Sequence, residues 1–325
     1  MDSFAGKIAI VTGGGSGMGR ELVRQLAAEG CSVAACDLNA DTLAETTELA
    51  SAGAAGTVRI TAHACDVSDE AAVLRFRDSA LAAHQAGHID LVFANAAIGG
   101  GGSFINDPRE QWERVFAVNW WGVYYTARAF LPLLIASPEG VLVNTSSVNG
   151  FWASLGPAWP HTAYSTAKFA VKGFTESLIE DLRTNAPHVR VALVMPGYIG
   201  TNIVANSRMV LAGRDTPRLS DVEVRRARSR MRQQGVDDSA ISDADIRARI
   251  QRQAQNFHDR APMTAGEAAR IILDAVKTGR WRVLVGEDAH KLDEKVRANP
   301  ERAYDPDFGA FDTASDISAS APRLV

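Results

Sequence analysis

Short apolar runs rich in Val, Ile and Ala alternate along this chain with longer segments in which apolar residues recur every three or four positions. The apolar runs are typical of strands and cover residues 7–12, 32–37, 59–65, 90–95, 140–146, 189–195 and 281–285. The longer segments are typical of helices and cover residues 17–29, 41–50, 70–85, 109–135, 163–184 and 265–278. Strands that are apolar on both faces must be covered on both sides. The alternation therefore predicts one α/β domain, a doubly wound parallel sheet of about seven strands with helices on both faces.

Two segments interrupt this alternation. One is the polar C-terminal tail at 287–325, which follows a domain at 1–286. The other, residues 202–262, is an insertion within the domain that we expect to close over a substrate as a lid. Its last part, Ser242–Asp259, carries an apolar stripe and begins with Ser242 and Asp245, which predicts a capped amphipathic helix packing on the domain.

The insertion also contains a basic run. It consists of Arg225, Arg226, Arg228, Arg230 and Arg232. We interpret it as a solvated helix face balanced by acids such as Asp221 and Glu223, rather than as a patch for an anion or a nucleic acid.

Composition changes this picture little and mainly excludes partners. Hydrophobic residues make up 46% of the 325 residues, and the net charge is −4, which does not indicate nucleic acid or an anionic membrane as a partner. Cys31, Cys36 and Cys65 lack the spacing of metal ligands, so we expect no metal and a reducing, cytoplasmic location.

Neither the N-terminus nor the apolar segment 116–136 changes this expectation of a cytoplasmic location. The N-terminus lacks the pattern of an export signal. Residues 116–136 are long enough to cross a bilayer, but Asn119, Arg128 and Pro132 interrupt them, so we expect a buried or interface helix and no membrane partner.

The first strand leads directly into the turn Thr12–Gly19, TGGGSGMG, and then into a helix. Backbone amides at such a helix N-terminus can bind a pyrophosphate, although a glycine turn alone can also be a tight structural connection. The spacing is GxxxGxG rather than GxGxxG. Asp37 ends the second strand, where a carboxylate accepts hydrogen bonds from ribose hydroxyls and repels a 2′-phosphate, which favours NAD over NADP. Arg20 and Arg24 are close enough in sequence to leave NADP open.

Further motifs follow at the ends of later strands. They are Asn95-Ala96-Ala97, Asn119, Ser146-Ser147-Val148-Asn149-Gly150, Tyr164-Ser165-Thr166-Ala167-Lys168 and Pro196-Gly197. Together with the glycine turn, in this order, they resemble the motifs of the classical short-chain dehydrogenase/reductase (SDR) family, closely over residues 4–200 and more loosely over 265–286. The resemblance implies a Rossmann-type fold, a nicotinamide cofactor and interconversion of an alcohol and a carbonyl compound.

The resemblance implies four catalytic residues. Tyr164 would transfer the hydroxyl proton, and Lys168, one helical turn away, would supply the positive charge that favours the phenolate. Ser147, rather than Ser146, would hold the substrate oxygen, because the family pattern places the serine three residues before the glycine. Asn119 would link Lys168 to solvent through a water molecule.

The resemblance also implies a set of cofactor contacts. Asp66 and Val67 would contact the adenine, Asn95 would line the floor of the site, and Ile199 and Thr201 would contact the nicotinamide carboxamide. The predicted cofactor-binding residues are Gly13, Ser16, Gly17, Met18, Gly19, Asp37, Asp66, Val67, Asn95, Tyr164, Lys168, Pro196, Ile199 and Thr201. Family members usually form dimers or tetramers through two long helices and the last strand, so a homodimer or homotetramer is implied.

The loop between Ser147 and Tyr164 is longer than in most family members. Its bulky residues are Phe151, Trp152, Pro157, Trp159 and Pro160. They form either a wall for an apolar substrate or a contact that packs the loop down.

We therefore expect an NAD(H)-dependent oxidoreductase that interconverts a largely apolar secondary alcohol and its ketone. The alternative is an NAD(H)-binding sensor without turnover. A reductase of ketones bound to an acyl carrier would be expected to prefer NADPH, which Asp37 disfavours.

Overall fold

The computed structural model describes residues 1–100, 102–155, 160–213, 219–233 and 236–308. Seven parallel strands form its main sheet, in the spatial order β3-β2-β1-β4-β5-β6-β9. Their bounds are Ile8–Thr12 (β1), Ser32–Asp37 (β2), Ile60–Ala64 (β3), Leu91–Ala94 (β4), Val141–Thr145 (β5), Arg190–Pro196 (β6) and Arg282–Val285 (β9). A second, two-stranded sheet joins β7 (Ile199–Gly200) to β8 (Met263–Thr264). The predicted doubly wound parallel sheet is confirmed.

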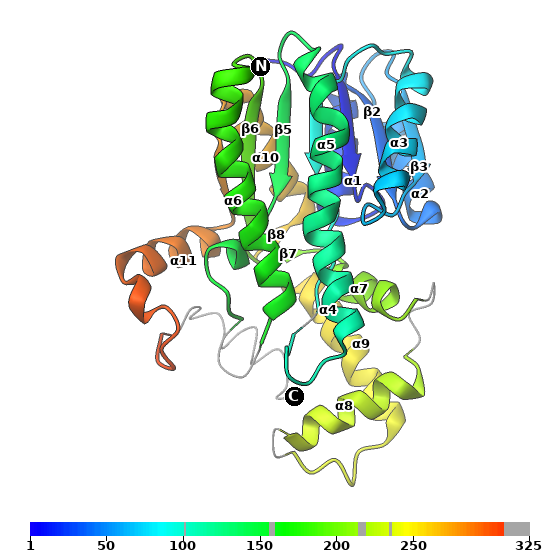
Figure 1. Ribbon diagram of the computed structural model, residues 1–325. Helices are drawn as coiled ribbons and strands as arrows, with labels where there is room; N and C mark the ends of the chain where they lie inside the picture. Colours follow the sequence, from blue (N-terminus) through cyan, green and yellow to red (C-terminus); the bar gives the residue numbers. More distant parts are fainter. Residues whose placement is uncertain (101, 156–159, 214–218, 234–235, 309–325) are drawn as a thin grey trace.

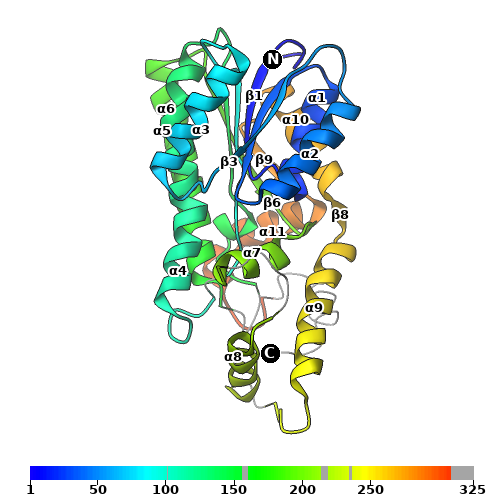
Figure 2. The same ribbon diagram turned by 90° about the vertical axis from the view of Figure 1, so that its right-hand side faces the viewer.

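Helices cover both faces of the sheet, which Figure 2 shows nearly edge-on. On one face lie α1 (Gly17–Ala28), α2 (Ala40–Ala52) and α10 (Ala265–Thr278). On the other lie α3 (Glu70–His84), α4 (Arg109–Phe116), α5 (Gly122–Ile135) and α6 (Thr162–Asn185). Neighbouring residues of one strand face opposite layers, as Phe93 and Val92 of β4 do, and this is why the central strands are largely apolar.

The segment predicted as one helix over 109–135 contains a local change of winding. A π-helical turn, η1 (Ala117–Trp121), joins α4 to α5. Such turns insert one extra residue into a helix and are frequent at functional sites. Asn119 lies in this turn.

The insertion projects beyond the carboxyl ends of the strands as α7 (Ile203–Leu211), α8 (Asp221–Gln233) and α9 (Asp243–Asp259) (Figure 1). The predicted cap of the last helix is confirmed, because the Ser242 hydroxyl accepts a hydrogen bond from the Asp245 amide at 3.1 Å. Its apolar stripe packs in two places. Ile246 joins a small core with α8, and Phe257 lies against the Tyr198 ring, with the ring centroids 4.7 Å apart.

The acids that balance the basic run differ from those expected. Arg228 pairs with Asp238 at 3.1 Å and with Asp243 at 2.7 Å, and Arg232 pairs with Asp238 at 2.8 Å. Asp221 instead pairs with an arginine of α9. These arginines are therefore balanced by acids, as expected, and Arg232 is exposed, but Arg228 is half-buried rather than on a solvated face; the side chain of Arg230 lies outside the described residues.

The segment predicted as a polar tail begins with a helix that the sequence analysis missed, α11 (Glu287–Ala298), followed by a short 3₁₀ turn, η3 (Pro300–Arg302). Ala289 and Leu292 pack on Val148 and Trp152 of the long loop after β5. The C-terminal segment therefore belongs to the packing of the domain up to residue 308, where the described part ends.

Candidate active site

The predicted site residues meet at the carboxyl edge of the sheet. The glycine turn follows β1, Asn95 follows β4, and Ser147 follows β5. The first part of α6, with Tyr164 and Lys168, lies next to the short 3₁₀ turn η2 (Val148–Gly150) that Ser147 begins. In an open parallel sheet this edge is where ligands bind.

The two serines after β5 have different partners. The Ser146 hydroxyl is buried and donates to the Lys168 carbonyl at 2.8 Å, and a Cβ at Gly150 would lie only 2.2 Å from it. Gly150 is therefore required for β5 and α6 to approach each other. The Ser147 hydroxyl accepts from the Asn149 amide at 3.1 Å and lies close enough to Tyr164 to lower the pKa of its phenol. Ser147 is thus placed beside Tyr164, while Ser146 holds the backbone.

Lys168 and Tyr164 lie one helical turn apart, with Nζ 5.5 Å from the centroid of the tyrosine ring. The lysine side chain is fully buried, and Nζ donates to the Thr145 carbonyl at 2.9 Å. Burial lowers the pKa of Lys168 to about 7, because the ammonium loses its hydration. Burial also raises the pKa of Tyr164, and the interaction with Ser147 acts in the opposite direction. In the protein alone, desolvation therefore outweighs the effect of Ser147, and a positive charge is needed to favour the phenolate.

Asn119 is fully buried in its π turn. Its Nδ2 donates to the carbonyls of Ile98 at 2.7 Å and Val115 at 2.8 Å. Its Oδ1 has no hydrogen-bond partner among the described residues, which leaves an acceptor suited to a buried water. No hydrogen bond given for the described residues joins Asn119 directly to Lys168, so the predicted link between them would require that water.

The turn after β1 is built so that only glycine fits at two of its positions. A Cβ at Gly19 would lie 2.0 Å from the Gly13 carbonyl oxygen. A Cβ at Gly13, where φ is +68°, would lie 2.8 Å from the Ala96 Cα. The turn therefore brings its backbone close to the segment after β4 and to the start of α1. Because no side chain stands in the way, a pyrophosphate could approach the backbone amides of this turn closely.

Asp37 and the arginines near it define the electrostatics beside the turn. The Asp37 carboxylate accepts from the Gly15 amide at 2.9 Å and from the Asn39 amide at 3.0 Å. The Arg20 guanidinium donates to the Gly15 carbonyl at 2.9 Å and pairs with Glu45 at 2.5 Å. Both partners fix Arg20 on the α2 side of the turn.

The other basic residue that left NADP open is also paired. Arg24 pairs with Glu21 at 2.7 Å. The residues that follow Asp37, Leu38 and Asn39, bring no positive charge.

The remaining predicted contacts lie around the same edge. Asp66 accepts from Ser68 and pairs with Arg114 at 2.7 Å, and these hydrogen bonds hold the pKa of its carboxyl below the usual value despite partial burial. Val67 is buried against Gly122. Asn95 donates through Nδ2 to the Thr12 carbonyl at 3.2 Å.

The segment after β6 approaches the turn from the other side. Pro196 ends β6, and Ile199 is buried in β7. Thr201 lies beside Gly17, where a Cβ would be 3.1 Å from the threonine side chain. Ser16 occupies the N-cap position of α1 without a side-chain capping bond, and Met18 lies in the first turn, partly buried against the core.

Sequence reasoning missed contacts made by α7. Asn206 donates to the Ser16 hydroxyl at 3.0 Å, and the Ser207 hydroxyl accepts from the Gly99 amide at 2.7 Å. These bonds hold α7 over the glycine turn and over the segment after β4. No motif in the sequence indicated them, because they join residues far apart along the chain.

The sequence reasoning also missed His161, whose ring lies against that of Tyr164 with the centroids 4.6 Å apart. The spacing of three residues before Tyr164 was the available signal, since residues i and i+3 share a helix face.

The aromatic loop after Ser147 is held by the C-terminal segment. Trp152 is 3% exposed, its Nε1 donates to the Ala303 carbonyl at 2.7 Å, and its ring lies near Phe308. For Trp152 the packing interpretation is therefore correct and the substrate-wall interpretation is wrong. Pro157 and Trp159 lie outside the described residues.

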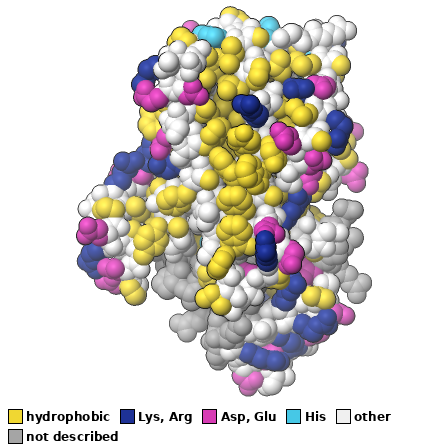
Figure 3. Space-filling model, viewed as in Figure 1, with side chains coloured by type: hydrophobic (Ala, Val, Ile, Leu, Met, Phe, Trp, Pro, Cys, Tyr) yellow, Lys and Arg dark blue, Asp and Glu magenta, His cyan; other side chains and the backbone are white. Residues whose placement is uncertain are grey.

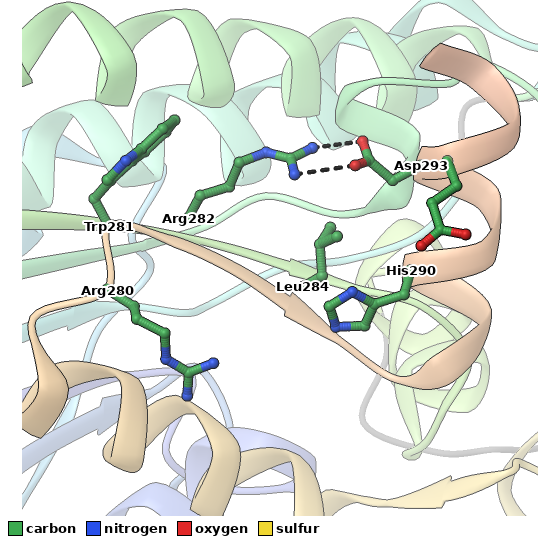
Figure 4. A pocket seen from close by; sticks show the side chains of 7 residues that line it. Arg280, Trp281, Arg282, Leu284, His290 and Asp293 are labelled. Carbon is green, nitrogen blue, oxygen red and sulfur yellow. Dashed lines mark hydrogen bonds and ion pairs between the residues drawn. The ribbon is translucent and has the colours of Figure 1, made fainter. Parts of the chain in front are cut away.

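A cavity of about 400 Å³ lies away from this site, between β9 and α11 (Figure 4). Figure 4 shows Arg282 aimed at Asp293, to which its NH1 donates at 3.0 Å. The acids Asp293 and Glu294 balance the guanidinium groups of Arg280 and Arg282, so the lining carries no net charge that would select a ligand. None of the four predicted catalytic residues lines this cavity.

Comparison with known proteins adds the following. The model of a protein family described as short chain dehydrogenase matches residues 7–210. SadH of Mycobacterium tuberculosis, provisionally named an oxidoreductase, is 34% identical over 91% of this chain and 92% of its own length.

Two solved structures are also similar. One is a short chain dehydrogenase/reductase from Burkholderia phymatum in complex with NAD, with a TM-score of 0.73 and 27% identity over 93% of this chain and 95% of that one. The other is a metagenomic short-chain oxidoreductase in complex with NADP, with a TM-score of 0.52 and 33% identity over 60% of this chain and 83% of that one.

Proposed function

The chain belongs to the short chain dehydrogenase family and is an oxidoreductase of that family; from this premise we propose that it interconverts a secondary alcohol and its ketone with NAD(H). The observation that carries the proposal is the convergence of Ser147, Tyr164 and Lys168. Ser147 lies close enough to Tyr164 to lower the pKa of its phenol, and Lys168 Nζ lies 5.5 Å from the centroid of the tyrosine ring.

The residues of the chain fit a nicotinamide dinucleotide. Bare backbone at Gly13 and Gly19 leaves room for the pyrophosphate, and Asp37 faces this turn through its bond to the Gly15 amide. When bound, the nicotinamide accepts or donates the hydride, and its oxidised form carries a positive charge.

The protein handles the proton that accompanies the hydride. Ser147 holds the substrate oxygen beside the Tyr164 hydroxyl, and the tyrosine takes its proton during oxidation or returns it during reduction. Lys168 orients the ribose and lowers the free energy of the phenolate. The orphaned Oδ1 of Asn119 binds the water through which protons reach solvent.

The cofactor we propose is NAD rather than NADP. Asp37 would lie beside the ribose, and a 2′-phosphate there would face a carboxylate. The neighbouring arginines are paired, Arg20 with Glu45 and Arg24 with Glu21, and Leu38 and Asn39 offer no cation. Because both arginines have carboxylate partners, the pairing supports NAD. They also disfavour an NADPH-dependent reductase of carrier-bound ketones.

We also propose that the protein is a homodimer or homotetramer. Aromatic side chains cover the face formed by η1, α5 and α6, and Figure 3 shows apolar side chains running down that face. Trp121 is 40% exposed and Phe169 is 41% exposed, and Trp120 contacts both Tyr124 and Phe174. Such a contiguous apolar face is typical of an interface, and a second copy is the occupant we propose.

No described helix is both long enough and apolar enough to span a membrane. A cytoplasmic location stays a prediction from the sequence.

The experiment compares purified wild-type protein with the Tyr164→Phe variant, each supplied with NAD or NADP and a panel of aliphatic, alicyclic, aromatic and steroidal secondary alcohols. We expect NADH formation by the wild type and a loss of about 10³-fold in the variant, since general acid–base catalysis contributes 10²–10⁴-fold. Binding of NADH without turnover of any alcohol or ketone would favour the sensor.

A further inference from the structure

A histidine that the proposed mechanism does not use lies in direct contact with Tyr164. His161 immediately precedes α6, and its ring centroid is 4.6 Å from that of Tyr164 at an interplanar angle of 38°. His161, Tyr164 and Lys168 share one face of the helix, because they follow one another at spacings of three and four residues. Tyr164 is therefore flanked by a lysine deeper in the domain and by a histidine at the helix start.

The start of α6 lies beyond the carboxyl ends of the strands, on the side of the insertion helices (Figure 1). His161 consequently lies farther from the sheet than Tyr164 does. Lys168, in contrast, reaches back to the Thr145 carbonyl at the end of β5. A substrate oxygen held by Tyr164 and Ser147 leaves the rest of the substrate to extend toward this outer side, where His161 lies.

The histidine is held in place by its neighbour. The Thr162 amide donates to the Gly102 carbonyl at 3.0 Å, and Trp112 donates to the Thr162 hydroxyl at 3.1 Å. These bonds tie the helix start to α4 and to the segment after β4. The position of the imidazole relative to the tyrosine is thus set by the fold.

The imidazole has hydrogen-bonding capacity that the described residues do not use. Its side chain does not cap α6, and no hydrogen bond joins either ring nitrogen to a described residue. Burial lowers the pKa of His161 to about 4, so the ring is neutral near pH 7 and offers one donor and one acceptor. The side chain is half-buried, and its ring nitrogens are not among the buried polar atoms that lack a partner, so they remain accessible to water or to a ligand.

We propose that His161 is a specificity-determining residue that hydrogen-bonds a second oxygen of the substrate, carried on the carbon next to the reacting one. This inference rests on the proposed function and names its substrate class: secondary alcohols with a neighbouring hydroxyl, and the matching hydroxyketones. The rest of the substrate is still expected to be apolar. The neutral imidazole donates to a carbonyl or accepts from a hydroxyl, so it serves both directions of the reaction.

The test uses matched pairs of alcohols that differ by one hydroxyl: 2-butanol with 2,3-butanediol, cyclohexanol with trans-1,2-cyclohexanediol, and 1-indanol with 1,2-indanediol. The readout is the ratio of kcat/KM for the diol to that for the plain alcohol, measured as NADH formation by the full chain. For the wild type we expect this ratio to exceed ~10 in at least one pair, because a site built to hydrogen-bond a group discriminates against the analogue that lacks it.

Two variants separate recognition from simple packing. His161→Phe keeps an aromatic ring against Tyr164 and removes both nitrogens, so we expect the ratio to fall to about 1, while the plain alcohol loses no more than about threefold. His161→Gln removes the ring and keeps a donor and an acceptor, so we expect it to retain part of the preference. Thr166→Ala, at an exposed position of the same helix, is the control, and its ratio should equal that of the wild type.

Equal losses on diol and plain alcohol in His161→Phe would overturn the proposal and assign the histidine a role in positioning the tyrosine. A wild-type ratio near 1 in every pair, with turnover of both members, would also overturn it while leaving the proposed function intact. Absence of turnover for all six alcohols and their ketones, with NADH still bound, would instead contradict the proposed function. The proposed substrate class would then be contradicted as well.

Discussion

The half of the molecule that would hold the cofactor and the half that would hold the substrate are built by different means. In the cofactor half, β1, the glycine turn and β2 are positioned by backbone: Gly19 and Gly13 approach within contact distance, and Asp37 accepts from a backbone amide. In the substrate half, side chains from distant segments hold the elements. Trp152 bonds Ala303, and Phe257 lies against Tyr198. Backbone constraints leave a signature of glycines in the sequence, whereas contacts between distant side chains leave none.

Lys168 lies where the two halves meet, and its loss should have the largest effect. We expect Lys168→Met to lower kcat/KM by about 10³-fold, within the range for proton-transfer catalysis, because the phenolate loses its charge partner. Steady-state assays with NAD measure this. The control is Lys172→Met, at a lysine of the same helix that pairs with Glu176, and it should retain activity within about threefold.

Lys168→Met should also change how the free energy of unfolding depends on pH. The pKa of Lys168 is about 7 in the folded protein and 10.5 in the unfolded chain, so the unfolded state binds more protons between these values. Stability of the wild type should therefore rise with pH from 7 to 10.5 by up to about 1.4 kcal/mol per pH unit from this group, and this part of the slope should vanish in Lys168→Met. Urea unfolding at pH 7, 8 and 9 measures the slope. Identical slopes for the two proteins would show that the lysine keeps its charge when buried.

A backbone constraint can be broken at Gly19. Its Cβ would lie 2.0 Å from a carbonyl oxygen of the turn, so Gly19→Ala should weaken NADH binding by about 100-fold through displacement of the turn, within the range of overpacking effects. NADH fluorescence titration measures this. Gly173→Ala in α6 is matched to it, because nothing lies within 4 Å of its Cβ, and it should stabilise the protein by up to about 1 kcal/mol. Normal NADH affinity in Gly19→Ala would contradict the backbone account.

Cofactor preference tests the role of one side chain, Asp37, in the half that would hold the cofactor. We expect the wild type to favour NAD, and the double variant Asp37→Ala with Leu38→Arg to shift the ratio of kcat/KM for NAD to that for NADP by about 30-fold toward NADP. An Arg24→Ala variant is the control, since Arg24 is paired with Glu21 and should not change the ratio. A wild-type preference for NADP would show that one of the paired arginines releases its acid to bind the phosphate.

The smallest expected effect concerns the aromatic face outside both halves. Trp121→Ala should weaken self-association by about tenfold, because large aromatic residues dominate interfaces. Sedimentation over a range of protein concentrations measures the shift, and Trp281→Ala tests the last strand in the same way, since Trp281 is 44% exposed beside β9. A monomeric wild type at all concentrations would remove the proposed interface.

The sequence was sufficient to predict every strand of the main sheet to within two residues at each end, because most of the strands are largely apolar runs bounded by polar residues or glycine. It also placed Ser147, Tyr164 and Lys168 in one site, since they follow known spacings at strand and helix ends. It did not reveal the π turn around Asn119, because the apolar positions on either side of it fit one continuous α-helix.

Two other features were not predicted from the sequence, for a different reason. Helix α11 is largely polar and became visible only through the packing of Ala289 and Leu292 on the long loop. The bond from Asn206 to Ser16 joins the insertion to the glycine turn across most of the chain. Features of this kind depend on which segments meet in three dimensions, and neither spacing nor periodicity encodes that.

The central claim is that this chain transfers a hydride between an alcohol and NAD, with Tyr164 transferring the accompanying proton, and isotope transfer tests it most directly. Wild-type protein and Tyr164→Phe are incubated with NAD and a secondary alcohol that carries deuterium on the carbinol carbon, and the cofactor is analysed by mass spectrometry. The account predicts deuterated NADH from the wild type and about 10³-fold less from the variant, with NADH affinity equal in the two. Equal label transfer by both proteins would contradict the role of Tyr164. Binding of NADH by both proteins without any label transfer would contradict the proposal that the protein is an enzyme.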